Sequence, residues 1–393
     1  MNILVVNIGS TSFKFRLFDM AAERVLARGG VEGVGAECST ITFQISDGEP
    51  AVNQDRVSDQ ADAVQRCMLR LTQSGGAEGF RIDAVGFKAV HGGSIAGAVR
   101  VTPEVIGVME EFADAAPAHN PPYIAAIKAF EAQMPGVPLV TAFETGFHQT
   151  IPPSRSTYAI PHEWTTEYGV RRYGFHGASH RYVATRVAEL VGRDDLRIIS
   201  CHLGGSSSIC AIRSGKSVAT SLGMTPQSGV PQNNRVGDFD AYALPVLANR
   251  TGLDTDALLA TMAKRGGLLG ISGVSNDMQK VIELAGQGHD RAALALDVFV
   301  ESVRDYIGAY LLALRGLDVL VFTGGIGERS AEVRRRVCDG LEFIGVRLDA
   351  ARNEQGGQTA TVSSDESIVR VLAMQTNEEL IVARQTKDVL AAC

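Results

Sequence analysis

The chain has 393 residues, of which 45% are apolar and 21% charged, and its 37 basic and 44 acidic side chains give a net charge of −7. This composition agrees with that of an ordinary globular enzyme, and the length favours two or more domains. The negative charge and the lack of any stripe of Lys or Arg argue against a nucleic-acid partner. No apolar stretch reaches the roughly 18 residues that span a bilayer, so we expect no membrane partner and a cytoplasmic location.

Short runs rich in Val and Ile alternate with longer segments of helical spacing, which predicts an α/β protein. The first two strands, at residues 2–6 and 12–18, enclose a loop of small and hydroxyl-bearing residues that also contains Lys14. Glycine lets the backbone approach a ligand, and the N–H, hydroxyl and ammonium groups can donate, so this loop predicts phosphate binding. The first half continues with strands at 40–45, 82–90 and 138–143 and helices at 60–73, 102–113 and 121–133.

The second half repeats this opening, with a strand at 197–202, a glycine and serine loop, and a strand at 208–213. The repeat suggests an ancestral duplication, with a boundary near Pro152 and Pro153 and a cleft between two lobes. Glycines at 324–327, between a strand at 318–323 and a helix from Ser330, indicate either a nucleotide contact or a tight packing turn. Together the loops favour a nucleotide-dependent phosphotransferase. The remaining elements expected are a strand at 217–219 and helices at 240–250, 255–264 and 290–314.

Metal sites built from Cys or His are not indicated. The six cysteines lie far apart without a Cys-x-x-Cys pair, which favours reduced thiols over disulfides or zinc. His176 and His180 are four residues apart, but Gly177 lies between them and no His-Glu-x-x-His arrangement is present. A histidine that donates to phosphate, or a structural histidine, is the better interpretation.

The chain resembles the acetate kinases, the carboxylate kinases of the acetate and sugar kinase, Hsp70 and actin superfamily. The resemblance implies a two-lobed actin-like ATPase fold with duplicated ribonuclease H-like domains and a central nucleotide cleft. It further implies an N-terminal lobe of residues 1–150 plus 380–393 for carboxylate and phosphate, a C-terminal lobe of 151–379 for nucleotide and dimerisation, and a homodimer. The segments that carry it are NIGSTSFK at 7–14, HGG at 91–93, HNP at 119–121, FETGFHQTIP at 143–152, RYGFHGASH at 172–180, GKS at 215–217, RVGDFD at 235–240, GISG at 270–273, FTGGIGE at 322–328 and TNEE at 376–379.

The resemblance implies reversible transfer of the γ-phosphoryl group of ATP to a short carboxylate, with Mg²⁺, giving an acyl phosphate and ADP. Such transfer needs fixed positive charge, donors and a metal more than a strong base. By resemblance, Asn7 and Glu378 hold Mg²⁺, Glu144, His176 and Arg235 are catalytic, and Lys88 and His119 bind the carboxylate. The residues that the resemblance assigns to phosphate and nucleotide are Ser10, Ser12, Lys14, His202, Leu203, Gly204, Gly205, Ser206, Asp277, Met278, Gln279, Gly325, Ile326, Gly327, Glu328 and Arg329.

The chain departs from the family pattern at several of these positions. Lys88 stands where the family has an arginine that clamps the carboxylate, so the charge stays but the bidentate fork is lost. Glu144 replaces a catalytic aspartate, Gln279 an arginine, and Arg329 an asparagine. Two loops also differ, with GGSS at 204–207 for GNGA and QNNRVG at 232–237 for MGTRSG.

Other interpretations of these residues and of the whole chain stay open. His91 suits a turn as well as a ligand contact, Arg235 could be a surface side chain, and Glu378 with Glu379 could be a solvated helix start. Acetate is the leading substrate; a kinase for propionate, butyrate or another short carboxylate, or one that uses pyrophosphate, is the alternative. A catalytically weak nucleotide-binding paralogue is the alternative from another class, and a sugar kinase fits less well because nothing marks a polyol pocket.

Overall fold

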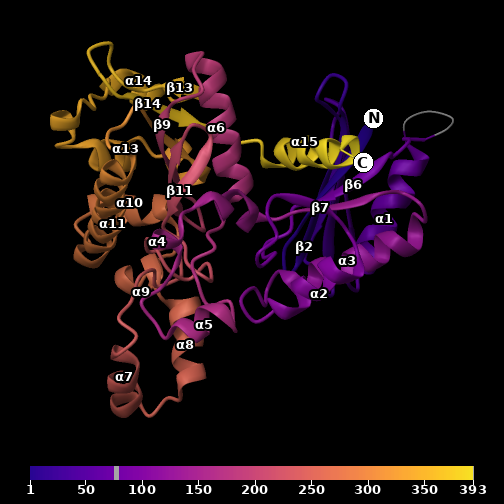
Figure 1. Cartoon of the computed structure of the whole chain (residues 1–393), viewed down its shortest axis with the longest axis horizontal. Coiled ribbons are helices and arrows are strands. Elements are labelled where there is room, and N and C mark those ends of the chain that lie inside the picture. The colour runs from indigo at the N-terminus through magenta and orange to yellow at the C-terminus, as the bar shows by residue number, and fades with distance from the viewer. Residues whose placement is uncertain (75–78, 393) are drawn as a thin grey trace. The chain divides into compact units, whose positions relative to one another are not determined.

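The computed structural model describes residues 1–74 and 79–392, which form two compact units (Figure 1). The first unit holds Met1–Gln149 and Asn377–Cys393, and the second holds Thr150–Thr376. The chain changes unit one residue earlier, and returns three residues earlier, than the lobe bounds of 1–150 and 380–393 that the resemblance implies. Glu378 and Glu379 therefore belong to the first unit. No helix in the described ranges is both long and apolar enough to cross a membrane.

The first unit is built on an eight-stranded sheet in the order β5-β4-β3-β2-β1-β6-β8-β7. Its central strand β1 has four consecutive buried residues, Ile3 to Val6, because both faces of the sheet are covered there. The strands are β1 Asn2–Ile8, β2 Ser12–Asp19, β3 Arg24–Glu32, β4 Ser39–Ile45, β5 Ala51–Asp55, β6 Ala84–Phe87, β7 Ala98–Arg100 and β8 Leu139–Ala142.

Helices cover the two faces of this sheet with different parts of the chain. Alternate residues of β1 and β2, such as Leu4 and Phe13, share a buried cluster with α1 and α3. Residues of the opposite parity, such as Ile3 and Phe18, pack against Val382 of the C-terminal helix α15. The helices of this unit are α1 Gln60–Gln73, α2 Pro103–Glu111, α3 Asn120–Gln133 and α15 Glu378–Ala391, with a 3-10 segment η1 Glu144–Thr150 at its end.

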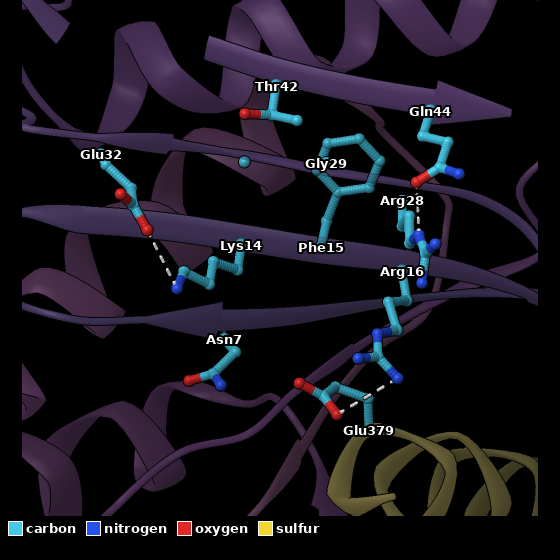
Figure 2. Close-up of a pocket in the computed structure, with 11 residues that line it drawn as sticks. Asn7, Lys14, Phe15, Arg16, Arg28, Gly29, Glu32, Thr42, Gln44 and Glu379 are labelled. Carbon is cyan, nitrogen blue, oxygen red and sulfur yellow. Dashed lines mark hydrogen bonds and ion pairs between the residues drawn. The ribbon is translucent and has the colours of Figure 1, made fainter. Parts of the chain in front are cut away.

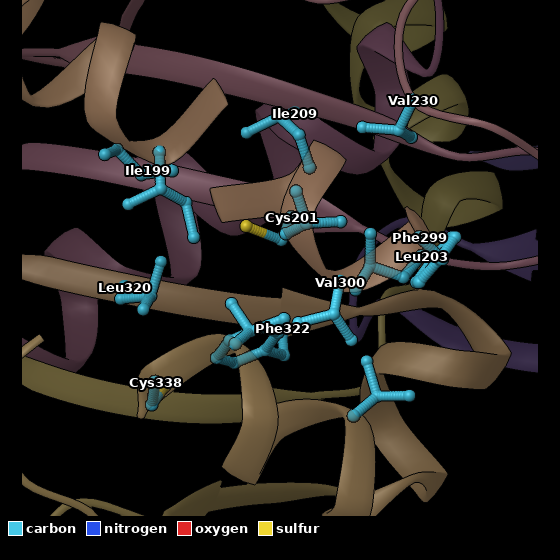
Figure 3. Close-up of a cluster of buried hydrophobic side chains, with 14 of the residues drawn as sticks. Ile199, Cys201, Leu203, Ile209, Val230, Phe299, Val300, Leu320, Phe322 and Cys338 are labelled. Carbon is cyan, nitrogen blue, oxygen red and sulfur yellow. The ribbon is translucent and has the colours of Figure 1, made fainter. Parts of the chain in front are cut away.

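The second unit has a six-stranded sheet in the order β11-β10-β9-β12-β14-β13. Figure 3 shows its core, in which side chains of β9, β10 and β12 meet Phe299 and Val300 of the long helix α11. The strands are β9 Arg197–His202, β10 Ser208–Arg213, β11 Lys216–Thr220, β12 Val319–Thr323, β13 Thr359–Thr361 and β14 Arg370–Met374. The helices are α4 Pro153–Ser156, α5 His162–Thr166, α6 Gly177–Val191, α7 Ala243–Thr251, α8 Thr255–Arg265, α9 Gly267–Ser272, α10 Met278–Gly286, α11 Asp290–Leu314, α12 Gly324–Arg329, α13 Ala331–Cys338 and α14 Ala350–Gln355, with a 3-10 turn η2 Glu342–Ile344.

The two sheets share one topology, as the repeated opening of the sequence predicts. In the first unit β1, β2 and β3 are antiparallel neighbours, while β6 and then β8 extend the sheet from β1 in parallel. In the second unit β9, β10 and β11 repeat the antiparallel part, and β12 and β14 repeat the parallel part. The carboxyl ends of parallel strands meet at one edge of a sheet, which is where open α/β sheets bind ligands.

The predicted elements are confirmed with three adjustments. The strand expected at 82–90 is limited to β6, so Lys88 and His91 follow it in a loop. The glycines at 324–327 begin the helix α12 instead of forming a loop before it. The helix expected at 240–250 begins at Ala243, because Asp240 and Tyr242 form a turn closed by the Asp240 carboxylate.

Candidate active site

In the first unit, the carboxyl ends of the three parallel strands bring together side chains that are far apart in the sequence. Asn7 lies near the end of β1, Lys88 directly follows β6, and Glu144 comes two residues after β8. The backbone fixes this edge, because the Lys88 N–H donates to the Val6 carbonyl at 2.9 Å and the Glu144 N–H donates to the Ala89 carbonyl at 2.9 Å.

Lys88 is held between two acidic side chains. Its Nζ lies 2.5 Å from Glu378 Oε2 and 3.3 Å from Glu144 Oε1, and the three side chains are only 17%, 17% and 6% exposed. Burial by itself lowers the pKa of Lys88, but the Glu378 and Glu144 carboxylates outweigh it and hold this pKa well above its ordinary value. Glu378 opens α15, where the helix dipole favours a negative charge. The structure therefore joins three of the predicted site residues in one buried cluster.

Tyr123 of α3 is a member of this region that sequence reasoning missed. Its ring is 1% exposed, its hydroxyl oxygen accepts from the Ile8 N–H at 2.8 Å, and the hydroxyl donates to Asn7 Oδ1 at 3.4 Å. The sequence gives no signal for this role, because a tyrosine inside a helix usually packs in the core. His119 lies half-buried just before α3, and its carbonyl accepts from the Tyr123 N–H at 3.2 Å.

Residues of β1 to β4 and Glu379 of α15 line a cavity of about 240 Å³ on the face of the sheet that carries α15 (Figure 2). Asn7 and Lys14 are cross-strand partners and both line it. Lys14 Nζ lies 3.2 Å from Glu32 in an exposed ion pair, which is weak and can be exchanged for a phosphate. Ser10 is exposed and Ser12 half-buried. The loop between β1 and β2 turns tightly, since a Cβ on Gly9 would lie 2.6 Å from Ser12 Oγ.

His91 has the structural role that the sequence left open beside a ligand contact. It is fully buried, its ring stacks on Phe112 at 4.5 Å, and its Nδ1 accepts from the Gly93 N–H at 3.1 Å. Its backbone is bonded to Asn120, which opens α3. These contacts order the loop that follows Lys88.

In the second unit, three histidines and three serines form a compact cluster. His176 precedes α6 with φ 57°, a left-handed conformation that is uncommon for a residue other than glycine. Its ring stacks on His202 at 4.2 Å, and His202 Nδ1 bonds Ser179 Oγ at 2.8 Å. His180, one turn along α6, is completely buried with both ring nitrogens bonded to serine hydroxyls.

Arg235 is joined to the glycine and serine loop of the second unit. Its guanidinium donates to Ser206 Oγ at 3.1 Å and to Gln232 Oε1 at 3.1 Å, and Ser206 Oγ donates to the same Gln232 oxygen at 2.8 Å. Its loop is fixed from behind, because the Asp238 carboxylate accepts from the Gly229 N–H at 2.8 Å and from the Tyr306 hydroxyl at 2.5 Å. These hydrogen bonds hold the Arg235 guanidinium beside the loop, so Arg235 is not a solvated surface arginine.

The two glycine loops of the second unit also lie together. The Leu203 carbonyl accepts from the Ile326 N–H at 2.8 Å and the Gly327 N–H at 3.1 Å, and Glu328 accepts from the Gly324 N–H at 3.1 Å. Gly204, Gly205 and Ser206 follow on one side and exposed Gly325 and Arg329 on the other. This brings most of the predicted nucleotide residues to the carboxyl ends of β9 and β12.

Leu203 and Met278 are placed differently from the other predicted nucleotide residues. Both side chains belong to the hydrophobic core of the second unit, so only their backbone groups could contact a ligand. Asp277 caps α10 by accepting from the Gln279 N–H at 2.9 Å, while the Gln279 side chain is exposed. The amphipathic pattern of α10 requires Met278 to point inward.

Arg334 of α13 supports the second glycine loop and was also missed. Its side chain is only 1% exposed. The guanidinium donates to the Gly327 and Glu328 carbonyls, both at 2.8 Å, and to Asn353 Oδ1 at 2.7 Å. The buried guanidinium therefore fixes the last turn of α12 through its backbone carbonyls.

We expect Arg334→Leu to destabilise the second unit by about 2–4 kcal/mol, because several buried acceptors lose their donor. Thermal unfolding should show a lower midpoint, because the last turn of α12 loosens. Arg335→Leu on the same helix is the matched control, since Arg335 is exposed and forms an ion pair with Glu332 at 2.9 Å. An unchanged midpoint for Arg334→Leu would contradict this role.

Comparison with known proteins agrees with this geometry. Residues 2–384 match the sequence model of the Acetokinase family. The chain belongs to this family. Acetate kinases of Bacillus velezensis and Bacillus subtilis are each 44% identical to it over 386 residues, covering 97% of this chain and 98% of each relative.

Solved structures of acetokinase relatives extend the likeness to the fold. The crystal structure of Porphyromonas gingivalis acetate kinase has a TM-score of 0.91 at 39% identity, and that of a propionate kinase from Francisella tularensis has 0.92 at 32%, each covering 99% of both chains. The predicted α/β fold class, the actin-like ATPase fold with two related domains, is thereby confirmed.

Proposed function

We propose that this member of the acetokinase family is an acetate kinase, which reversibly transfers the γ-phosphoryl group of ATP to acetate and yields acetyl phosphate and ADP. The observation that carries the proposal is the match to acetate kinases along almost the whole chain. The arrangement of polar residues at the carboxyl ends of the parallel strands in both units supports it.

The first unit would hold the carboxylate and the metal. Asn7 Oδ1 and the Glu378 carboxylate are oxygen donors of the kind that Mg²⁺ prefers, so the residues fit this cation. When bound, Mg²⁺ neutralises charge on the phosphate oxygens. We assign Lys88 and His119 to the carboxylate substrate and Lys14, Ser10 and Ser12 to phosphate. Glu144 would orient the Lys88 ammonium, which it contacts at 3.3 Å.

The second unit would hold the nucleotide and stabilise the group in transfer. Arg235 and His176 supply donors for the oxygens that carry negative charge in the transition state. Because the acceptor carboxylate is already a nucleophile, no strong base is required. The nucleotide would lie on His202 with Gly204, Gly205 and Ser206, on the segment from Gly325 to Arg329 with Ile326, Gly327 and Glu328, and on Asp277, Gln279 and the backbone of Leu203 and Met278.

A propionate kinase is the second candidate function. The Francisella tularensis propionate kinase matches this chain as closely in structure as the Porphyromonas acetate kinase does. Lys88, which stands where the resemblance leads us to expect arginine, is the residue whose shorter reach could alter the preferred chain length.

We further propose a cytoplasmic homodimer that associates through α7 and α8. Tyr242, Val246 and Leu259, on and beside these helices, are 86%, 47% and 47% exposed and provide apolar surface for a second copy to cover. Helix α7 has no buried residue of its own, so a second copy would bury the face that the unit leaves open.

The proposed reaction predicts acyl phosphate formation that hydroxylamine traps as a hydroxamate. Acids from formate to valerate should be tested with Mg²⁺ and either ATP or pyrophosphate, with acetate and ATP giving the highest turnover. Chelation of the metal should abolish turnover and added Mg²⁺ should restore it. A maximum with propionate would replace the first candidate by the second, and no turnover with any acid, from folded protein that binds ATP, would contradict both.

A further inference from the structure

The histidine and serine cluster of the second unit contains a bridge between two imidazole rings. Ser208, the first residue of β10, bonds His176 Nδ1 at 2.9 Å and His180 Nε2 at 2.8 Å through the same Oγ. The other nitrogen of His180, Nδ1, bonds Ser200 Oγ of β9 at 2.9 Å. Ser200, His180 and Ser208 are all 0% exposed, so the bridge is shielded from solvent and runs from the core to His176.

The bridge couples the proton positions of the two histidines. The Ser208 hydroxyl has one proton, so it can donate to only one of the two nitrogens and must accept from the other. If His180 carries its proton on Nε2, it donates to Ser208, and Ser208 donates to His176 Nδ1. A neutral His176 must then carry its proton on Nε2. In the opposite arrangement His176 is protonated on Nδ1, and in the neutral ring its Nε2 can then only accept.

The first arrangement is the one that a phosphoryl-transfer site requires. A histidine stabilises negatively charged oxygens as a donor, and Nδ1 of His176 is already occupied by Ser208. We propose that His180 is a positioning residue which, through Ser208, keeps the proton of His176 on Nε2. The coupling of the two proton positions rests on the contacts above, whereas the choice of Nε2 for the His176 proton rests on the proposed function.

Two further features indicate that the bridge sets the orientation of the His176 ring as well as the position of its proton. The His176 ring is fixed on one side by Ser208 and on its face by His202, so a small set of contacts defines its plane. The backbone of His176 is left-handed, with φ 57°, at the N-cap of α6. Strained conformations of this kind are found at functional sites.

Ser208→Ala tests the bridge, because it removes one oxygen atom from β10 and leaves both histidines in place. Nitrogen-15 spectra of the histidine rings, recorded on the full-length protein without substrate, should show His176 protonated on Nε2 with Nδ1 as a hydrogen-bond acceptor. In Ser208→Ala the His176 Nδ1 resonance should shift, and kcat should fall by about 10- to 100-fold with a much smaller change in KM for ATP. Ser208→Thr keeps the hydroxyl and should restore both properties.

Ser221→Ala is the matched control. Ser221 is also a buried serine beside β10, but its hydroxyl accepts from the Ile209 N–H at 2.9 Å, and within residues 1–74 and 79–392 it forms no hydrogen bond with a histidine. It should leave the His176 spectrum and kcat unchanged. Ser200→Ala, which breaks only the far end of the bridge, should still shift the His176 signals if the coupling is real.

A His176 proton found on Nδ1, or a His176 spectrum unaffected by both Ser208→Ala and Ser200→Ala, would overturn the proposal. Because the spectra need no turnover, this result is separate from the fate of the proposed function. A protein that phosphorylates no carboxylate would contradict the function while the spectra could still confirm the bridge.

Discussion

Arg235→Ala is expected to reduce kcat by roughly 10³-fold, the effect of removing an arginine that stabilises charge in phosphoryl transfer. The affinity for ATP should change far less, because the donors of the two glycine loops remain. Steady-state kinetics for acyl phosphate formation, with ATP binding measured separately by calorimetry, would divide the loss between the transition state and the ground state.

The structure explains why this substitution should leave the loop intact. Ser206 donates directly to Gln232 at 2.8 Å, and Asp238 is held by Gly229 and Tyr306, so none of these contacts needs the guanidinium. Arg235→Lys should recover only part of the activity, because it restores charge without the planar fork. Arg193→Ala, which removes an exposed arginine of the same unit, is the control. Equal losses in kcat and in ATP affinity would contradict a transition-state role.

The sequence predicts those parts of the site that depend on local pattern. Asn7, Lys88 and Glu144 were assigned by the resemblance, and the structure shows that each follows a run of buried residues at a strand end, where a fold presents polar groups. Because their strands are parallel and adjacent, a correct assignment of β1, β6 and β8 already brings these residues to one edge. The glycine loops after β9 and β12, in contrast, are predicted by the local pattern of a buried strand that runs into small residues.

The residues that were missed are those whose partners are distant or whose local pattern is misleading. Arg334 resembles an exposed helical arginine until Asn353, nineteen positions away, folds beside it. Ser208 and Ser200 differ little from other serines in strands, and only the pairing of β9 with β10 places them around His180. Strand β3 was not among the expected strands. It contains Arg28, Gly29 and Gly30, and these charges and glycines obscure the alternation of apolar and polar residues that is expected of a strand.

Lys88→Met should lower the free energy of unfolding of the first unit by about 3–5 kcal/mol, because it leaves two buried carboxylates without their cation. In the unmodified protein the raised pKa keeps Lys88 charged, so its contribution is fully present below the ordinary lysine pKa of about 10.4 and is lost only as the pH rises through the higher folded value. Stability that depends on Lys88 should therefore be constant between pH 6 and 9.

Lys88→Met should also make stability depend on pH in the range where the Glu144 and Glu378 carboxylates titrate. Without the ammonium, Glu144 and Glu378 lie buried near one another, so their folded pKa values should rise above the unfolded ones. The folded state then binds more protons than the unfolded state, and stability falls as the pH increases. Denaturant unfolding of Lys88→Met at pH 5 and pH 8 should show the larger loss at pH 8.

Two comparisons separate this effect from the mere loss of a charge. Lys280→Met removes a lysine from an ion pair with Glu283 in which both side chains are about half exposed, and it should cost less than about 1 kcal/mol at either pH. Lys88→Arg keeps the charge and should preserve stability while changing KM for the carboxylate, since the guanidinium can contact it with two donors. A loss in Lys88→Met that is equal at both pH values would mean that the two carboxylates are not coupled through Lys88.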